Sequence, residues 1–254
     1  MAKPSDDARL KIVWAQKHLD IVKLEVKRYI HSGAYRVTTN LKGKGREYVP
    51  IVKTQPSTDI SLAIGDCVCS AMASLDYIVW GLAGLYAGRP LVPPPVGHDA
   101  PSFPLFVDPV KFKKTERPGG FKIPAAVLSI IEQVQPYNAG YEPLGCLYLL
   151  VNQDKHRLPL LTVGCVAATT IDIDYGGGHF TTSIGFGSNA AKTHPDSPFT
   201  PATQPEPVNV QVEVAGFVAF DDPAMPRESV VVTLQKIVTT IRDSVIPKFD
   251  PVFT

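Results

Sequence analysis

Apolar residues in the first part of the chain recur with the period of an α-helix. Between residues 9 and 31 they stand three or four positions apart, and a more apolar stripe of the same period runs through 58–87. This spacing gathers them on one face of a helix. Shorter stripes predict helices at 124–134 and 144–157, the second opened by Pro143. We expect the segment 58–87 to be the central helix.

Other stretches alternate apolar and polar residues, which is typical of β-strands. Alternation on both sides of the KGKG turn at 42–45 predicts a hairpin over 34–55, and Pro50 confines its second strand to a sheet edge. After Pro159, strands are predicted at 161–173, 180–186 and 208–220. A final helix is predicted at 227–246, ending at Pro247.

This order of elements predicts an α+β fold. Residues 1–157 would form a helical half with an inserted β-hairpin. Residues 158–254 would form an antiparallel, strand-rich half closed by a helix, either as a second domain or as part of one continuous domain. The Pro-rich connection 88–123 could close over the polar end of the 144–157 helix or wrap along the surface, held by Phe103, Phe106 and Phe112.

The composition and the motif content bear on where the protein is located and on which metals or cofactors it could use. Of the 254 residues 44 % are hydrophobic, enough for a core, but no uninterrupted apolar run approaches 18 residues and no signal peptide opens the sequence. We therefore expect a cytoplasmic protein without a membrane partner. The four cysteines lack zinc-ligand spacing, so we expect reduced thiols and no metal site. The sequence has no Walker A, GxGxxG, HExxH, GxSxG or CxxC motif, so any cofactor stays unknown.

The net charge of +1 is unevenly distributed. Residues 1–55 hold 12 Lys and Arg against 5 Asp and Glu, a net +7. Such a segment could face an acidic partner or nucleic acid. A solvated helix face and a Lys-protected hairpin edge explain the charge more simply. Because the sequence shows no aromatic stacking platform between these charges, nucleic acid is not the expected partner.

The densest group of polar residues ends the 144–157 helix: Asn152, Asp154, Lys155, His156 and Arg157. Asp154 follows Leu147 by seven residues, so it shares the inward face and is expected to be buried and paired with a cation or backbone N–H groups. Asp154 could then orient His156 as a general base, while Lys155 and Arg157 bind an anion that Asn152 positions. The alternative is structural: Asp154 ties the helix to a neighbour, His156 packs, and the cations cap the helix.

Two carboxylates of the central helix are further candidates. Asp66 and Asp76 lie ten residues apart, about 15 Å along a helix axis, so they cannot form one paired site. We expect at least one of them to reach the cluster at 152–157. Asp76 joins His156 and Asp154 as a catalytic candidate, and Asp66 is a binding candidate.

Four motifs resemble those of a family of uncharacterised bacterial and phage-encoded proteins. They are Gly65-Asp66, Ser74-Leu75-Asp76, Gln135-Pro136-Tyr137-Asn138 and Asn152-Gln153-Asp154-Lys155-His156-Arg157. The resemblance adds Gln135 and Tyr137 to the binding candidates and implies no established activity. A looser similarity links the central helix to HEPN-type ribonucleases, whose Arg-x4-His signature is replaced here by Met72 and Tyr77.

Three functions remain open from the sequence. The first is a hydrolase or a binding protein for a small polar or anionic molecule, using the cluster at 152–157. The second is a HEPN-like nucleic-acid-processing domain, which would often act as a homodimer. The third is a non-catalytic interaction module.

Overall fold

The computed structural model describes residues 4–42, 45–86, 101–114, 123–159, 161–174, 179–185, 192–193, 211–226 and 228–253. The chain divides into two compact units, each assembled from separate parts of the sequence. The first unit combines 1–23, 58–159 and 231–254. The second combines 24–57 and 160–230. These units cut across the boundary expected at 157/158.

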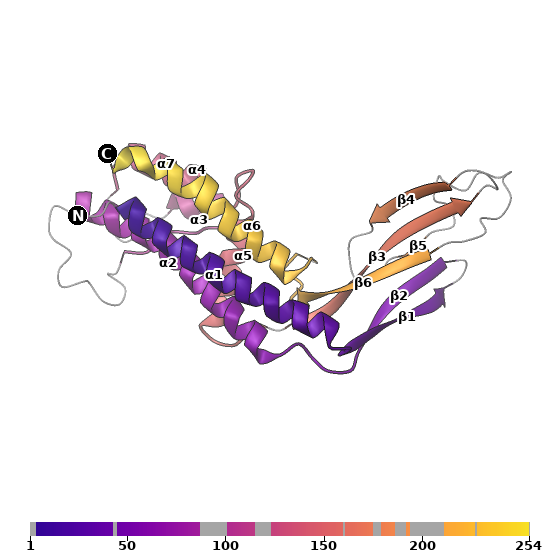
Figure 1. Cartoon of the computed structure of the whole chain (residues 1–254). Helices are drawn as coiled ribbons and strands as arrows, with labels where there is room; N and C mark the ends of the chain where they lie inside the picture. Colours follow the sequence, from indigo (N-terminus) through magenta and orange to yellow (C-terminus); the bar gives the residue numbers. More distant parts are fainter. Residues whose placement is uncertain are drawn as a thin grey trace. The chain divides into compact units, whose positions relative to one another are not determined.

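The first unit is helical (Figure 1). Its long helices are α1 and α2, and α1 continues past Lys23 into the second unit. Their bounds are Pro4–His31 and Thr58–Tyr86; the shorter helices are α3 (Pro109–Lys114), α4 (Ala125–Gln133), α5 (Pro143–Asp154), α6 (Val230–Thr240) and α7 (Ile246–Phe249). The predicted periodic segments therefore form helices, although α1 begins five residues earlier and α5 ends three residues earlier than expected.

The core of this unit forms around α2, which buries residues along most of its length. The buried stripe of α1 (Ala8, Ile12, Ala15, Leu19 and Val22) faces it, and the Cys67 thiol donates a hydrogen bond of 3.4 Å to the carbonyl of Ala15. Gly81 permits the close approach of both chain ends, because a Cβ there would collide with Pro4 and Phe253. The prediction of a central helix at 58–87 is confirmed.

The C-terminal helix continues through Pro247, where the sequence predicted its end. A π-helical turn, Ile241–Val245, links α6 to α7 and is followed by the 3₁₀ turn Asp250–Val252. Proline lacks an N–H, and its ring crowds the preceding turn of a helix. The wider π-helical turn accommodates Pro247, so the helix continues past it. Fully buried side chains hold the helix against the core on both sides of the proline: Ile241, Val245 and Ile246 before it and Phe249 after it.

Among the described residues, α2 alone has the length and composition to cross a membrane, and 56 % of its most apolar window is buried within the protein. The sequence argument that no uninterrupted apolar run reaches this length missed it because Asp66 and Asp76 interrupt the run. A buried core helix can have the same length and apolar composition as a membrane-spanning helix, so these two properties do not distinguish the two kinds of helix.

The second unit contains two antiparallel sheets. The predicted hairpin is formed by β1 (Tyr35–Lys42) and β2 (Gly45–Val52). The two strands are antiparallel, and Tyr35 of β1 pairs with Val52 of β2. The short strand β5 (Lys192–Thr193) adds to β2, which gives the order β1-β2-β5. The other sheet has the order β4-β3-β6. Its strands are β3 (Leu161–Asp174), β4 (His179–Gly185) and β6 (Gln211–Phe220).

The predicted fold class is wrong at the level of the whole chain. Across the residues described with their side chains, 68 % are helical and 7 % lie in strands, and the C-terminal part is not a strand-rich half closed by a helix. Residues 231–254 belong to the helical unit. Periodicity identifies an element's type, but the apolar face of a helix can be buried against segments far away in sequence. The turn expected at 176–178 and residues 208–210 lie outside the described part.

Candidate functional site

A cleft of about 250 Å³ lies between α2 and α5. The segment 102–106, part of the Pro-rich connection, forms its third wall. Its lining residues are Met72 from α2, Ser102, Phe103, Pro104, Leu105 and Phe106 from this segment, and Tyr148, Val151, Asn152 and Lys155 from α5 and its C-terminal end. The walls are therefore mainly apolar, with a few polar groups among them. The sequence predicted a site at the cluster 152–157, and two members of that cluster, Asn152 and Lys155, line this cleft.

One face of α2 supplies the contacts beside the cleft. Gly65, Cys69, Met72 and Asp76 follow one another at spacings of four, three and four residues, which aligns them along a helix. Gly65 lets α5 approach closely, since a Cβ at this position would collide with the Asp154 carboxylate. The small residue is therefore what brings the end of α5 onto α2.

Asp154 is half-buried and takes a partner other than the one predicted. The Cys69 thiol donates a hydrogen bond to Asp154 Oδ2 over 3.4 Å. No cation or backbone N–H binds this carboxylate within the described part of the chain, so the predicted partners are wrong. Partial desolvation, the hydrogen bond to Asp154 and the charges of Asp154 and Asp66 raise the pKa of Cys69 to about 11. The thiol is therefore protonated at neutral pH and acts as a donor rather than as a nucleophile.

Asp76 is partly buried and contacts the cleft wall. Burial raises the pKa of its carboxyl to about 6, opposed by a hydrogen bond from the Phe103 N–H and by the positive charge of Lys155. The bond to Phe103 measures 2.8 Å. Asp76 thus fixes the backbone of a cleft residue, and its link to the cluster at 152–157 is the charge of Lys155.

The cluster itself divides at the end of α5. Asn152 and Lys155 line the cleft, whereas His156 and Arg157 do not; Lys155, His156 and Arg157 are all exposed. No described carboxylate lies within 4.0 Å of the His156 ring. The general-base hypothesis required Asp66, Asp76 or Asp154 at that distance, so we do not retain a catalytic role for His156.

The other binding candidates lie outside the cleft. Gln135 is fully buried, accepting from the Phe106 N–H and donating to the carbonyls of Pro104 and Ile131, each over 2.9 Å. It positions the 104–106 wall without lining the cleft. Desolvation raises the pKa of Tyr137, whose buried hydroxyl has no hydrogen-bond partner among the described residues. Asp66 is 67 % exposed and lies 3.8 Å from the His18 ring.

Sequence reasoning missed Cys69, Met72 and Tyr148 as site residues, whereas the 102–106 wall belongs to the 88–123 connection that the sequence allowed to close over the polar end of the 144–157 helix. The 4-3-4 spacing from Gly65 to Asp76 was the available signal for the first two, because it already placed them beside both carboxylate candidates. The wall could not be found from periodicity, since it is an irregular segment. Met72 and Tyr77, the two positions of the HEPN signature, line different cavities, so they do not form one site.

The chain matches no protein-family model, and no similar chain is found among curated proteins or solved structures. In the described part, no group of three or more His, Cys, Asp or Glu side chains is arranged to hold a metal ion. Function is therefore argued from the geometry of the cleft.

Proposed function

We propose that the protein binds a small molecule with an anionic group beside an apolar ring, in the cleft between α2 and α5. A volume of about 250 Å³ fits a molecule smaller than most drug-sized ligands. Met72, Phe103 and Val151 provide apolar contact for the ring. A few polar groups on apolar walls are the usual composition of a binding site.

The observation that carries the proposal is the position of Lys155. Its side chain lines the cleft, and no described carboxylate forms an ion pair with it within 4.0 Å. An anionic group in the cleft would neutralise this ammonium, and the Asn152 amide lies one turn earlier to donate a hydrogen bond.

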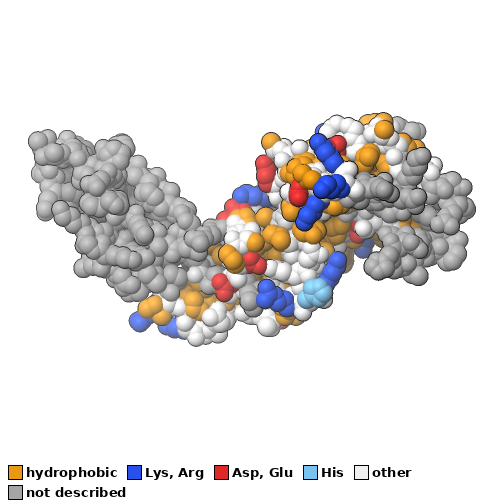
Figure 2. Space-filling model, turned by 180° about the vertical axis from the view of Figure 1, so that it is seen from behind, with side chains coloured by type: hydrophobic (Ala, Val, Ile, Leu, Met, Phe, Trp, Pro, Cys, Tyr) orange, Lys and Arg blue, Asp and Glu red, His pale blue; other side chains and the backbone are white. Residues whose placement is uncertain are grey.

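The described part of one face of the molecule favours a small anion over a long polyanion. On the face shown in Figure 2, basic side chains are intermixed with acidic and hydrophobic ones over the described part of the molecule. Nucleic-acid binding draws on many phosphate contacts along a basic surface. We therefore do not carry the nucleic-acid alternative forward.

The test uses phenyl phosphate and benzoate as anionic probes and benzyl alcohol as the neutral counterpart, titrated by calorimetry and by ligand-observed NMR. Lys155→Met removes the charge and retains most of the side-chain length. We expect it to weaken binding of both anions about tenfold or more, the value of a charged hydrogen bond. Arg157→Met is the matched control, since Arg157 is a neighbouring cation outside the cleft, and should leave binding unchanged. No saturable binding, or equal binding by Lys155→Met, would refute the proposal.

A further inference from the structure

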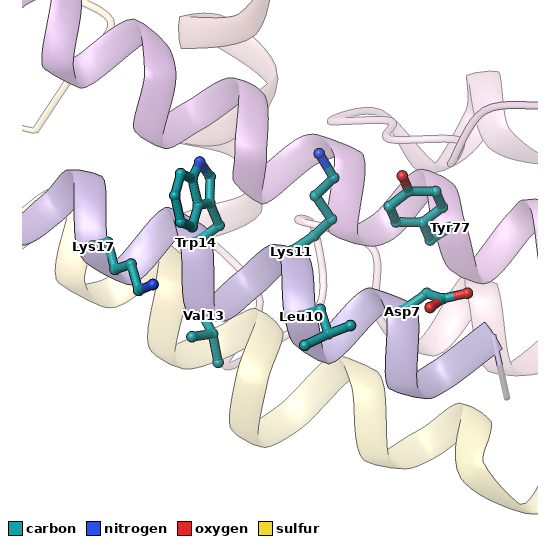
Figure 3. Close-up of a pocket in the computed structure, with 7 residues that line it drawn as sticks. All are labelled: Asp7, Leu10, Lys11, Val13, Trp14, Lys17 and Tyr77. Atoms are coloured by element: carbon teal, nitrogen blue, oxygen red, sulfur yellow. The ribbon is translucent and has the colours of Figure 1, made fainter. Parts of the chain in front are cut away.

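A second cavity, separate from the α2–α5 cleft, follows the outer face of α1. It measures about 570 Å³ and is lined by Asp7, Leu10, Lys11, Val13, Trp14 and Lys17 of α1 and by Tyr77 of α2. Figure 3 shows Lys11 of α1 standing between Tyr77 of α2 and Trp14, which lies one turn further along α1. We call this cavity the α1 groove.

The groove lies on a helix that is apolar on two opposite faces. The buried stripe of α1 packs on the core, whereas Leu10, Trp14 and Ile21 are 69 %, 50 % and 46 % exposed. With Lys17 they stand at spacings of four, three and four residues, which is the repeat of a helix that pairs with another helix. An outward stripe of this kind has no role in the fold of the unit and marks an interaction surface.

The charges around the groove indicate the charge of the partner that it would bind. On α1, Asp6, Asp20 and Glu25 pair with Arg9, Lys23 and Arg28. Lys11 and Lys17 have no ion pair among the described residues and lie against aromatic rings, 5.8 Å from the centre of Tyr77 and 4.6 Å from the centre of Trp14. Six residues separate these lysines, about 9 Å along the helix. Lys17 therefore adds an unneutralised cation within the outward stripe and Lys11 adds one beside it, while Asp7 is the acidic residue among those lining the groove.

We propose that the α1 groove binds an acidic amphipathic helix of a partner protein. Its apolar side chains would enter the groove beside Trp14, and its carboxylates would pair with Lys11 and Lys17. A second copy of this chain is the poorer occupant, because its α1 has already paired three of its four acidic residues and presents the same two lysines. A flat lipid surface would leave the α1 groove unfilled.

The test uses the full chain and a synthetic helical peptide about three heptads long, with leucines at heptad spacing and glutamates on both flanks. A matched peptide carries glutamine at every glutamate position. Trp80→Phe leaves Trp14 as the fluorescent reporter, because the chain has two tryptophans. We expect the glutamate peptide to bind saturably and the glutamine peptide to bind at least fivefold more weakly, with the difference disappearing in the variant Lys11→Gln/Lys17→Gln.

Trp14→Ala, followed by calorimetry, should weaken binding of the glutamate peptide roughly thirtyfold, as expected for a central aromatic anchor. Trp14 is half-exposed, so the variant should keep its thermal unfolding curve. Leu85→Ala, an exposed apolar residue of α2 outside the groove, is the control and should bind normally. Equal affinity for both peptides, or no effect of Trp14→Ala, would overturn the proposal. So would self-association in sedimentation equilibrium that Trp14→Ala abolishes, or binding to phosphatidylserine vesicles in preference to the peptide.

Discussion

The Cys69 thiol donates a hydrogen bond to the Asp154 carboxylate, with 3.4 Å between Sγ and Oδ2. This contact joins α2 to the last residue of α5 beside the cleft. It depends on the missing side chain of Gly65, which leaves room for the carboxylate. The contact therefore links a glycine, a thiol and an acid that lie far apart in the sequence.

Gly65→Ala should break this contact. The new Cβ would meet the end of the Asp154 side chain, which can rotate away at small cost. Without the hydrogen bond and the adjacent charge, the pKa of Cys69 should fall from about 11 toward its ordinary value of 9.0. Alkylation rates measured against pH, with Cys69 distinguished from Cys67 by fragment mass spectrometry, would report the change.

Gly84→Ala is the matched control on the same helix, since nothing lies within 4 Å of a Cβ at that position. It should stabilise the protein by about 1 kcal/mol through helix propensity and leave the Cys69 profile unchanged. If Gly65→Ala also left the profile unchanged, the described contact would not determine the reactivity of the thiol.

Asp76 should make stability depend on pH. Its pKa is about 6 in the folded protein against an ordinary value of 3.8, so between these values the folded state binds more protons than the unfolded state. Stability should therefore decrease as pH rises from about 4 to about 6 and stay lower above that range. Asp76→Asn removes the charge and keeps an oxygen to accept from the Phe103 N–H. It should stabilise the protein at pH 8 by on the order of 2 kcal/mol and have little effect at pH 4.

Urea denaturation at both pH values measures this difference. Asp66→Asn is the control, because Asp66 is exposed, and it should change stability equally little at both pH values. A gain from Asp76→Asn that is the same at pH 4 and pH 8 would mean that burial of the charge is not its cause.

The sequence predicted those features that depend on neighbouring residues and not those that depend on packing between distant segments. Periodicity identified α2 and the β1–β2 hairpin, because both are patterns of neighbouring residues. Periodicity could not assign residues 231–254 to the helical unit. A buried helix face, such as that of Ile241 and Phe249, does not show which segment it packs against. The assembly of the units was therefore predicted wrongly although most elements were predicted correctly.

The candidate site shows the same limit. The helical-wheel argument for the 144–157 segment correctly placed Asp154 on the face toward a neighbouring helix. It could not show that this helix offers the Cys69 thiol rather than a cation. It also extended α5 three residues too far. Helix ends are the least certain part of a periodic pattern. That error placed His156 on the helix, whereas it follows the last helical residue and is exposed.

His156→Ala should be nearly silent for stability. The ring is exposed and has no carboxylate within 4.0 Å among the described residues, so its removal should change the free energy of unfolding by less than about 0.5 kcal/mol. It should also leave binding of phenyl phosphate unchanged, since His156 does not line the cleft. Thermal unfolding and calorimetry would check both statements. A loss of binding comparable with that of Lys155→Met would return His156 to the site.

Gln135→Leu should be the most destabilising of these substitutions. The Gln135 side chain is fully buried and forms three hydrogen bonds of 2.9 Å, two of them to the segment 104–106. Leucine fills a similar volume but leaves the Phe106 N–H and the Pro104 carbonyl unpaired in the interior, which should cost about 3 kcal/mol in urea denaturation. Because this segment is a wall of the cleft, phenyl phosphate binding should weaken even under conditions where the variant stays folded. Gln133→Leu, two residues earlier and exposed, should change stability by less than about 0.5 kcal/mol. Equal effects of the two substitutions would show that the buried hydrogen bonds of Gln135 do not hold the wall in place.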